Sequence, residues 1–247
     1  MKAMIFAAGL GTRLKPITDE IPKALVPIGG KPLLQHVIEK LKASGFDEII
    51  VNVHHFSNQI IDFIISKNYF DIRIEFSDET EKLLDTGGAI KKASWFFDDN
   101  QPFLIHNVDI ISNIDLRVLV DTHLLRGVDA SVVVSERDTF RYLLFDKCNL
   151  LRGWINEKTR DVKPSGIEYD VHEFDKLAFS GIQVINPSLF TLFDSFPDKF
   201  SIIDFYLNIS NKKEVFGFIP ENFSMVDVGK IDTLDEVEKY ISNSFTT

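Results

Sequence analysis

The chain has 247 residues, of which 45% are hydrophobic and 26% charged, a composition typical of a soluble globular protein and unlike that of a disordered chain. Its formal net charge of −10 excludes a general nucleic-acid binder, because such proteins need a basic face. No run approaches the roughly 18 apolar residues of a membrane span, and the single cysteine cannot form an internal disulfide. We therefore expect a cytoplasmic protein that uses neither a membrane nor nucleic acid as partner.

Strands and helices alternate in the first half of the chain. The apolar run 2–8 predicts a buried strand, which enters a glycine-rich loop that continues to about Pro32. Helical spacing of apolar residues predicts a helix from Leu33 to Leu41, which ends at Gly45. The segments that follow predict a strand at 48–55, a helix at 57–67, a strand at 72–76, a helix at 86–97 and a strand at 102–109. This alternation predicts a Rossmann-like α/β fold, with a mixed, mainly parallel sheet and helices on both faces.

The second half of the chain is richer in predicted strands. They fall at 130–136, 142–146, 151–157, 176–186 and 214–220, with short helices near 187–194 and 201–209 and a closing helix at 232–243. Internal repeats and low-complexity linkers are not found in the sequence. One domain over residues 1–247 is the simplest organisation.

The loop Gly9–Arg13 after the first strand is the first sign of chemistry. Glycines let the backbone approach a ligand closely, and successive amides there can bind phosphate oxygens. A dinucleotide site needs a third glycine where Leu14 stands, and a P-loop needs Ser or Thr where Pro32 follows Gly30-Lys31, so both of those classes are excluded. Residues 1–42 hold seven basic and three acidic side chains, which favours a small anionic ligand in an otherwise acidic protein.

Seven short blocks together resemble one family. The string from Gly9 to Thr18 matches G-x-G-T-R-L-x-P-x-T, and the string from Pro22 to Pro27 matches P-K-x-L-x-P. Five more blocks follow in family order: Asp85–Gly88, Asn107–Asp109, Glu157-Lys158, Phe179–Gly181 and Val226–Gly229. The chain thus resembles the sugar-1-phosphate nucleotidyltransferase family over nearly its whole length. Its short length and its T-G-G block look most like the N-acetylmuramate-1-phosphate uridylyltransferase and mannose-1-phosphate guanylyltransferase branch.

The resemblance implies the nucleotide-diphospho-sugar transferase fold, with a nucleotide-binding half at 1–110 and a sugar-phosphate-binding half at 111–247. It implies direct in-line transfer, in which the protein stabilises charge and aligns the reactants. Catalysis would fall to Arg13, Lys23 and Asp109, with Arg13 on the departing pyrophosphate and Lys23 on the α-phosphate. The residues implied to bind the nucleotide are Ala8, Gly9, Gly11, Thr12, Arg13, Lys23, Thr86, Gly87 and Gly88, and those implied to bind the sugar phosphate are Asn107, Glu157, Lys158 and Gly181. By the same resemblance, Asp109 and Asp227 would bind Mg²⁺, which prefers hard oxygen ligands.

Several alternatives stay open. We expect an NTP and a sugar 1-phosphate as substrates, with UTP and N-acetylmuramate 1-phosphate first, GTP with mannose or heptose 1-phosphate second, and CTP with phosphocholine more distant. The rival from another class is a non-catalytic regulatory domain of the same fold. Val108 stands where the family usually has glycine, so the geometry beside Asp109 or the preference for the sugar could differ. The sequence leaves the oligomeric state open.

Overall fold

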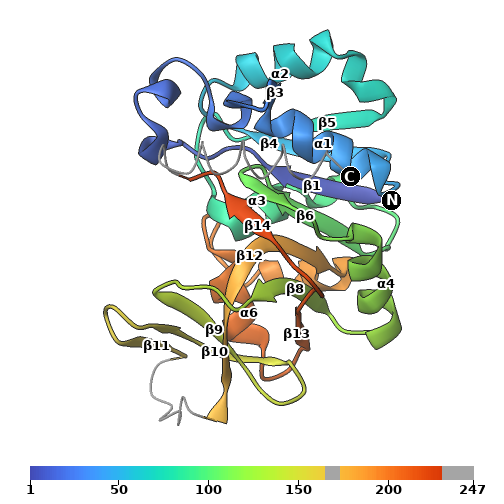
Figure 1. The fold of residues 1–247 in the computed structure, drawn as a ribbon. Helices are drawn as coiled ribbons and strands as arrows, with labels where there is room; N and C mark the ends of the chain where they lie inside the picture. The colour runs from blue at the N-terminus through green and yellow to red at the C-terminus, as the bar shows by residue number, and fades with distance from the viewer. Residues whose placement is uncertain (165–172, 230–247) are drawn as a thin grey trace.

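The computed structural model describes residues 1–164 and 173–229 (Figure 1). The α-helices are α1 (Leu33–Ala43), α2 (Ser57–Ser66), α3 (Asp85–Ala93), α4 (Leu116–Arg126), α5 (Phe190–Phe193) and α6 (Ile202–Ile209). The strands are β1 (Lys2–Phe6), β2 (Pro27–Ile28), β3 (Lys31–Pro32), β4 (Glu48–Val53), β5 (Arg73–Asp78), β6 (Phe103–Asn107), β7 (Ile110–Ser112), β8 (Ala130–Ser135), β9 (Arg141–Phe145), β10 (Leu151–Asn156), β11 (Asp161–Lys163), β12 (Asp175–Ile185), β13 (Val215–Phe218) and β14 (Met225–Asp227). Single-turn 3₁₀ helices occupy Thr12–Leu14, Ile17–Asp19, Lys23–Leu25, Asn68–Asp71, Ser94–Phe96 and Pro187–Leu189.

Ten of the described strands form one mixed sheet, in the order β11-β10-β9-β12-β6-β1-β4-β5 with β8 and β13 branching from β12. The four strands β6, β1, β4 and β5 run parallel, and β12 joins β6 in the antiparallel direction. Strand β1 has β4 on one side and β6 on the other, so the chain order reverses at β1. In open α/β sheets, ligands bind beyond the carboxyl ends of the strands at such a reversal.

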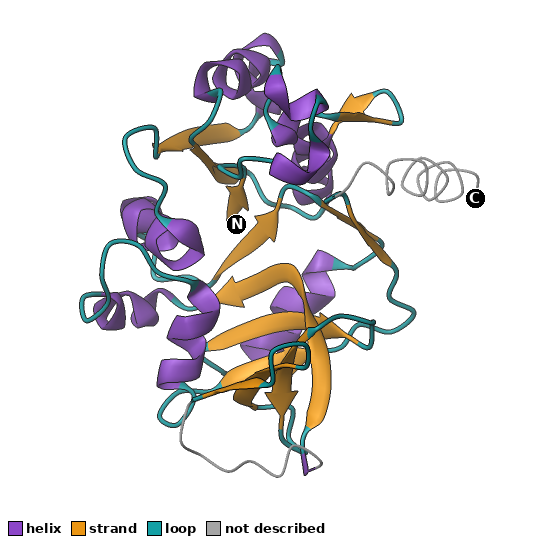
Figure 2. Ribbon diagram, turned by 90° about the vertical axis from the view of Figure 1, so that its left-hand side faces the viewer, coloured by secondary structure: helices purple, strands orange, loops and turns teal. Residues whose placement is uncertain are grey.

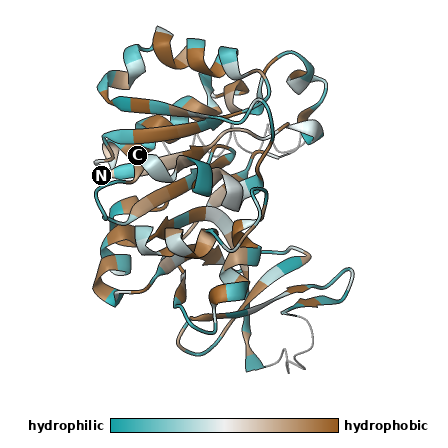
Figure 3. Cartoon of the chain, turned by 180° about the vertical axis from the view of Figure 1, so that it is seen from behind, coloured by the Kyte–Doolittle hydropathy of each residue, from teal (hydrophilic) through white to brown (hydrophobic). Residues whose placement is uncertain are grey.

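Helices cover both faces of this sheet (Figures 1 and 2). Along β1 the side chains alternate between the faces: Ala3 and Ile5 pack with α1, α2 and α4, whereas Met4 packs with α3, α5 and α6. Strand β4 alternates in the same way, and the strands at the centre of the molecule are accordingly the most hydrophobic (Figure 3). Burial on both faces explains why these strands read as continuous apolar runs in the sequence. The predicted fold class is confirmed.

The structure corrects several predicted elements. The predicted helix at 86–97 ends as α3 at Ala93 and continues only as a 3₁₀ turn, and α4 was missed altogether. Helix α4 begins after Asp115, whose side chain accepts hydrogen bonds from the amides of Arg117 and Val118, and ends at a left-handed glycine. Exposed leucines on its outer side blur the apolar period that would have revealed it. The predicted closing helix at 232–243 lies outside the described residues.

None of the described helices is long and apolar enough to cross a membrane.

Candidate active site

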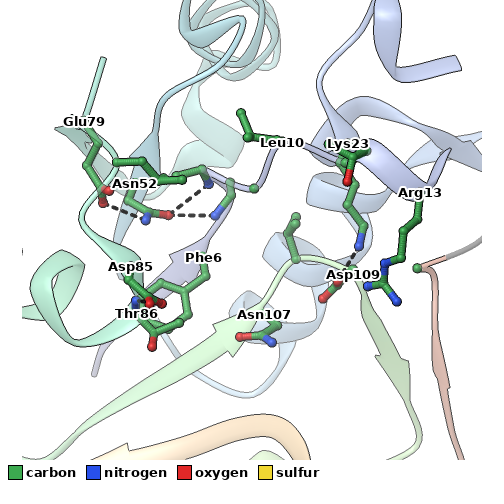
Figure 4. Close-up of a pocket in the computed structure, with 18 of the residues that line it drawn as sticks. Phe6, Leu10, Arg13, Lys23, Asn52, Glu79, Asp85, Thr86, Asn107 and Asp109 are labelled. Atoms are coloured by element: carbon green, nitrogen blue, oxygen red, sulfur yellow. Dashed lines mark hydrogen bonds and ion pairs between the residues drawn. The ribbon is translucent and has the colours of Figure 1, made fainter. Parts of the chain in front are cut away.

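A pocket of about 480 Å³ opens at the carboxyl ends of β1, β4 and β6, where the strand order reverses. Its wall includes the backbone from Phe6 to Arg13, and Lys23 and Asp109 stand at one end of it (Figure 4). The sequence-predicted residues that line it are Ala8, Gly9, Gly11, Thr12, Arg13, Lys23, Thr86, Asn107 and Asp109. The structure therefore gathers most of the predicted nucleotide-binding residues at one place, from segments far apart in the chain.

Asn52 holds the start of the glycine loop in place. Its side-chain oxygen accepts hydrogen bonds from the amides of Ala7 at 2.7 Å and Ala8 at 3.3 Å, and its amide donates to Glu79 Oε1 at 2.8 Å. The second Glu79 oxygen accepts from the amide of Leu84 at 3.0 Å. These contacts tie the ends of β1, β4 and β5 to the start of α3, and the left side of Figure 4 shows the bonds of Asn52. Because every partner is buried, breaking one bond would leave an unpaired polar group.

The loop after this point depends on one left-handed residue. Gly11 has φ +63°, and a Cβ there would lie 2.8 Å from Thr18 Cγ2. The Thr18 hydroxyl donates to the Gly11 carbonyl at 2.9 Å and so fixes the turn that presents Thr12 and Arg13. Both the conformation and the close packing require glycine.

Lys23 and Asp109 form an ion pair at the mouth of the pocket (Figure 4). Lys23 comes from a 3₁₀ turn of the N-terminal loop, and Asp109 follows the end of β6. The backbone between β6 and β7 is held by two bonds: the Val108 amide donates to the Phe6 carbonyl at 3.1 Å, and the Val228 amide to the Asp109 carbonyl at 2.8 Å. Val108 is buried and does not adopt a positive φ, so the valine at this position introduces no left-handed strain.

Asp227 reaches the same place from the C-terminal half of the chain. Strand β14 pairs antiparallel with β7, and Asp227 lies opposite Ile110, next to Asp109. The aspartate thus arrives on a separate two-stranded sheet and not at a strand end of the main sheet (Figure 1). Burial raises the pKa of the Asp227 carboxyl and the negative charge of Asp109 adds to this, while Lys23, Arg13 and Arg137 oppose the shift.

The two aspartates fit a divalent cation. Asp227 Oδ1 is buried and has no hydrogen-bond partner among the described residues, which is costly for a carboxylate unless a cation binds it. A Cβ on Gly229 would lie 2.8 Å from this oxygen and 3.0 Å from the Arg13 guanidinium, so a larger residue there would displace the ends of these two side chains. No third His, Cys, Asp or Glu joins the pair in the part of the chain that is described. Mg²⁺ commonly uses one or two protein carboxylates and completes its shell with water and phosphate oxygens.

Gly87 and Gly88, in contrast, do not line this pocket. They are buried in α3, where a Cβ on Gly87 would lie 2.2 Å from the Phe200 ring and one on Gly88 would lie 2.0 Å from the Asp198 carbonyl oxygen. The amides of both glycines also point to the Phe200 carbonyl, at 2.9 and 3.3 Å. Close packing of α3 on the segment before α6 is therefore a sufficient reason for both glycines, and their contact with a base or sugar stays a prediction.

The predicted sugar-binding residues fall into two groups. Asn107 lines the main pocket. Gly181, at φ +74°, packs against Asn107, whose side-chain nitrogen would lie 2.8 Å from a Cβ there. Glu157 and Lys158 instead lie exposed in the turn between β10 and β11. Glu157 pairs with Lys176 at 2.9 Å, and the Lys158 ammonium lies 5.8 Å from the centre of the Phe140 ring. The structure does not bring Glu157 and Lys158 into the main pocket.

Asn52, Glu79 and Lys199 line the pocket and are among the residues that sequence reasoning missed. The polar Asn52 inside the apolar run 48–53 could have indicated this role, because a buried polar side chain needs hydrogen-bond partners. Lys199 lies in a loop whose spacing carries no such signal. Only the folded chain brings it to the pocket.

Comparison with known proteins places this chain in a family. The family described as nucleotidyl transferase matches residues 2–141, so the chain belongs to the nucleotidyl transferase family and the resemblance seen in the sequence is confirmed. It is similar to the UTP–glucose-1-phosphate uridylyltransferase of Synechocystis, with 32% identity over 220 residues, 74% of this chain and 56% of that protein. It is also similar to the mannose-1-phosphate guanyltransferase of Kluyveromyces lactis, with 30% identity over 239 residues, 93% of this chain and 62% of that protein.

Among solved structures, the fold resembles that of HddC from Yersinia pseudotuberculosis in complex with GMP-PN. The TM-score is 0.75 at 25% identity, and the match covers 97% of this chain and 99% of HddC. The match covers 56% of the Synechocystis protein and 62% of the Kluyveromyces lactis protein. The remainder of each relative lies outside the match.

Proposed function

We propose that this protein transfers a nucleoside monophosphate from an NTP to a sugar 1-phosphate, releasing pyrophosphate. The observation that carries this proposal is the convergence of Arg13, Lys23, Asp109 and Asp227 beside the loop from Gly9 to Thr12. Two cations and two carboxylates at one pocket suit a phosphate ligand accompanied by a metal ion, whereas a domain that only binds sugars needs no such pair. Family membership and the names of the relatives support the same reaction class.

In the proposed reaction an oxygen of the sugar phosphate forms a bond to the α-phosphorus, and the bond to the β-phosphate bridging oxygen breaks. The amides of the loop from Gly9 to Thr12 and the Arg13 guanidinium would hold the triphosphate and the departing pyrophosphate. Mg²⁺ held by Asp109 and Asp227 would neutralise phosphate charge and polarise the α-phosphorus. Lys23, which pairs with Asp109 in this structure, would bind the α-phosphate. The protein then acts by alignment and electrostatics, without a covalent intermediate.

For the identity of the base and the sugar we propose two candidate pairs of an NTP with a sugar 1-phosphate. UTP with N-acetylmuramate 1-phosphate is the pair that the sequence blocks favour. GTP with mannose or heptose 1-phosphate is favoured by the relatives, one of which is named a mannose-1-phosphate guanyltransferase and another of which was solved with GMP-PN. A cytoplasmic location is part of the same proposal.

A panel of four NTPs against these sugar 1-phosphates, with pyrophosphate release as readout, tests the proposal. We expect pyrophosphate only when an NTP and a sugar 1-phosphate are both present. Hydrolysis of an NTP without an acceptor would contradict the reaction class. Absence of turnover across the whole panel, together with tight binding of a nucleotide or sugar phosphate, would favour a regulatory domain of the same fold.

A further inference from the structure

A separate pocket, of about 560 Å³, opens at the edge of the main sheet, between strand β5 and the 3₁₀ turn that follows helix α3. Strand β5 is the last strand on that side of the sheet in the part of the chain that is described (Figure 1). We call it the tryptophan pocket and define it by Ser77, Asp78, Thr80, Glu81, Lys92 and Trp95. None of these six residues lines the main pocket, so the two pockets are distinct.

The segment after β5 lies in the wall of both pockets and presents its side chains alternately. Glu79 is only 1% exposed and turns inward, where it accepts hydrogen bonds from the side chain of Asn52 and from the amide of Leu84. Its neighbours Asp78 and Thr80 are exposed and line the tryptophan pocket. The contacts that hold the glycine loop therefore leave these two neighbours available for another ligand.

Ser77 is the buried polar group of the tryptophan pocket. Ile74 and Phe76 pack in the core on the α1 and α2 side of the sheet. Side chains alternate along a strand, so Ser77 faces the opposite side, from which Lys92 and Trp95 come. Its side chain is 3% exposed, and its hydroxyl oxygen has no hydrogen-bond partner among the described residues. An unpaired buried hydroxyl is costly, and pairing with a ligand hydroxyl would remove that cost.

Trp95 gives the pocket an exposed apolar surface. The residue is 56% exposed, although the indole ring is large and mostly apolar. Its ring centre lies 5.9 Å from that of Phe96 and the two ring planes meet at 86°, so the buried Phe96 supports the orientation of the indole. An exposed indole offers a flat apolar face for a ligand whose other groups remain in water.

The charges around the indole are mixed. Asp78 and Glu81 are acidic, Lys92 is basic, and all three are exposed. The Lys92 ammonium donates to the Asp78 carbonyl, and the Asp78 carboxylate accepts from the Thr80 amide at 2.8 Å, which orders this wall. An anionic ligand would meet two carboxylates, and a cationic ligand would meet the ammonium group. A neutral ligand with many hydroxyls can donate to the carboxylates and accept from the ammonium group at once.

We propose that the tryptophan pocket binds a neutral sugar ring, at a site separate from that of nucleotidyl transfer. The C–H face of a pyranose ring lies on Trp95, its hydroxyls pair with Glu81 and Lys92, and one hydroxyl reaches Ser77. Because most of the lining side chains are exposed, the sugar stays partly in water, and we expect a dissociation constant in the millimolar range.

The test measures binding of the methyl glycosides of glucose, mannose and N-acetylglucosamine by saturation-transfer NMR, without nucleotide. The wild-type protein is expected to bind at least one of them at millimolar concentration. Trp95→Ala should weaken that binding at least ~10-fold, and Trp95→Phe, which keeps an aromatic ring, should weaken it less. Phe140→Ala is the matched control, because Phe140 is 63% exposed and lies outside the tryptophan pocket. It should bind as the wild type does.

Ser77→Ala separates contact with the ligand from a role in the fold. It should weaken sugar binding ~5-fold, the effect of one hydrogen bond between neutral groups. The melting temperature of the free protein should stay the same or rise, because the substitution removes an unpaired hydroxyl. Unchanged sugar binding with a lower melting temperature would contradict the contact between Ser77 and the sugar.

The ring could belong to a free sugar or to the end of a longer glycan. Cellobiose that binds more tightly than methyl glucoside would identify a glycan end, and equal affinities would identify a single ring. No binding of any neutral glycoside, equal binding by the wild type and Trp95→Ala, or tighter binding of methyl glucuronide or glucosamine than of every neutral glycoside would each overturn the inference. Because no nucleotide is present, failure of the proposed reaction would leave these results unaffected.

Discussion

The Lys23 ammonium group pairs with the Asp109 carboxylate across 86 positions of the chain, and the two side chains are only 10% and 21% exposed. The pair joins the N-terminal loop to the end of β6, at the place where Asp227 also arrives. Each partner compensates a charge that burial would otherwise make costly. The two residues are therefore coupled, and substitutions of either one test both the stability of the site and its chemistry.

Asp109→Asn and Asp227→Asn are each expected to lower kcat by at least ~100-fold, because each removes one charge from the proposed Mg²⁺ site, and losing such electrostatic stabilisation costs several kcal/mol. The secondary structure seen by circular dichroism should stay as in the wild type. Asp121→Asn, in an exposed position of α4, is the matched control and should keep full activity. Pyrophosphate release at saturating Mg²⁺ measures the effect, and near-normal turnover in either site variant would remove that aspartate from the catalytic machinery.

Lys23→Ala should depress kcat much more than it raises the KM for the NTP, because its charge is proposed to follow the negative charge that shifts in the transition state. The substitution also leaves Asp109 unpaired, so the melting temperature should fall in the absence of Mg²⁺ and recover when Mg²⁺ and an NTP are added. Steady-state kinetics and thermal melts with and without Mg²⁺ check both parts. A pure KM effect would show that Lys23 binds the ground state only.

Gly9→Ala and Gly88→Ala separate catalysis from packing. A Cβ on Gly9 meets nothing within 4 Å, whereas one on Gly88 would lie 2.0 Å from the Asp198 carbonyl oxygen. Gly88→Ala should therefore destabilise the fold by about 1–3 kcal/mol through overpacking. Gly9→Ala should leave the free energy of unfolding nearly unchanged while reducing activity, since the added methyl group stands where phosphate oxygens approach the backbone. Urea unfolding and pyrophosphate release distinguish the two effects, and the reverse pattern would contradict the placement of both glycines.

His106 should make the fold sensitive to acid. It is fully buried in β6, its Nε2 has no partner among the described residues, and burial lowers its pKa from 6.5 to about 4. Below about pH 6.5 the unfolded chain binds a proton at His106 and the folded chain does not, so protonation favours unfolding. Above that pH His106 is neutral in both states and does not lower the free energy of unfolding. Stability is lost as the pH falls toward 4, and the loss approaches about 3 kcal/mol there.

The measurement is the free energy of unfolding between pH 7.5 and 4 in the wild type and in His106→Leu, in which this group no longer titrates. The slope against pH should be smaller in the variant. Parallel curves for the two proteins would mean that His106 is not the origin of the acid sensitivity.

Much of the N-terminal half could be predicted from the sequence, for a physical reason. Strands β1, β4 and β6 are buried on both faces and so appear as continuous apolar runs, and α1 and α2 carry one apolar face. Helix α4 was not predicted, because apolar residues also lie on its outer side and obscure the helical period; Leu125, for example, is 89% exposed. The pairing of β14 with β7 was not predicted either, because a strand of three residues is too short to show an alternating pattern.

The sequence by itself determined the family, the fold class and the glycine loop, because these depend on local backbone requirements and on short strings of residues. Only the tertiary structure decided that Asp227 meets Asp109 through a separate two-stranded sheet, that Gly87 and Gly88 pack on the segment before α6, and that Glu157 and Lys158 lie outside the main pocket. It also decided that Arg137 and Arg141 line one pocket. Such contacts join residues far apart in the chain, and their partners are chosen by the packing of whole elements, which no local pattern records.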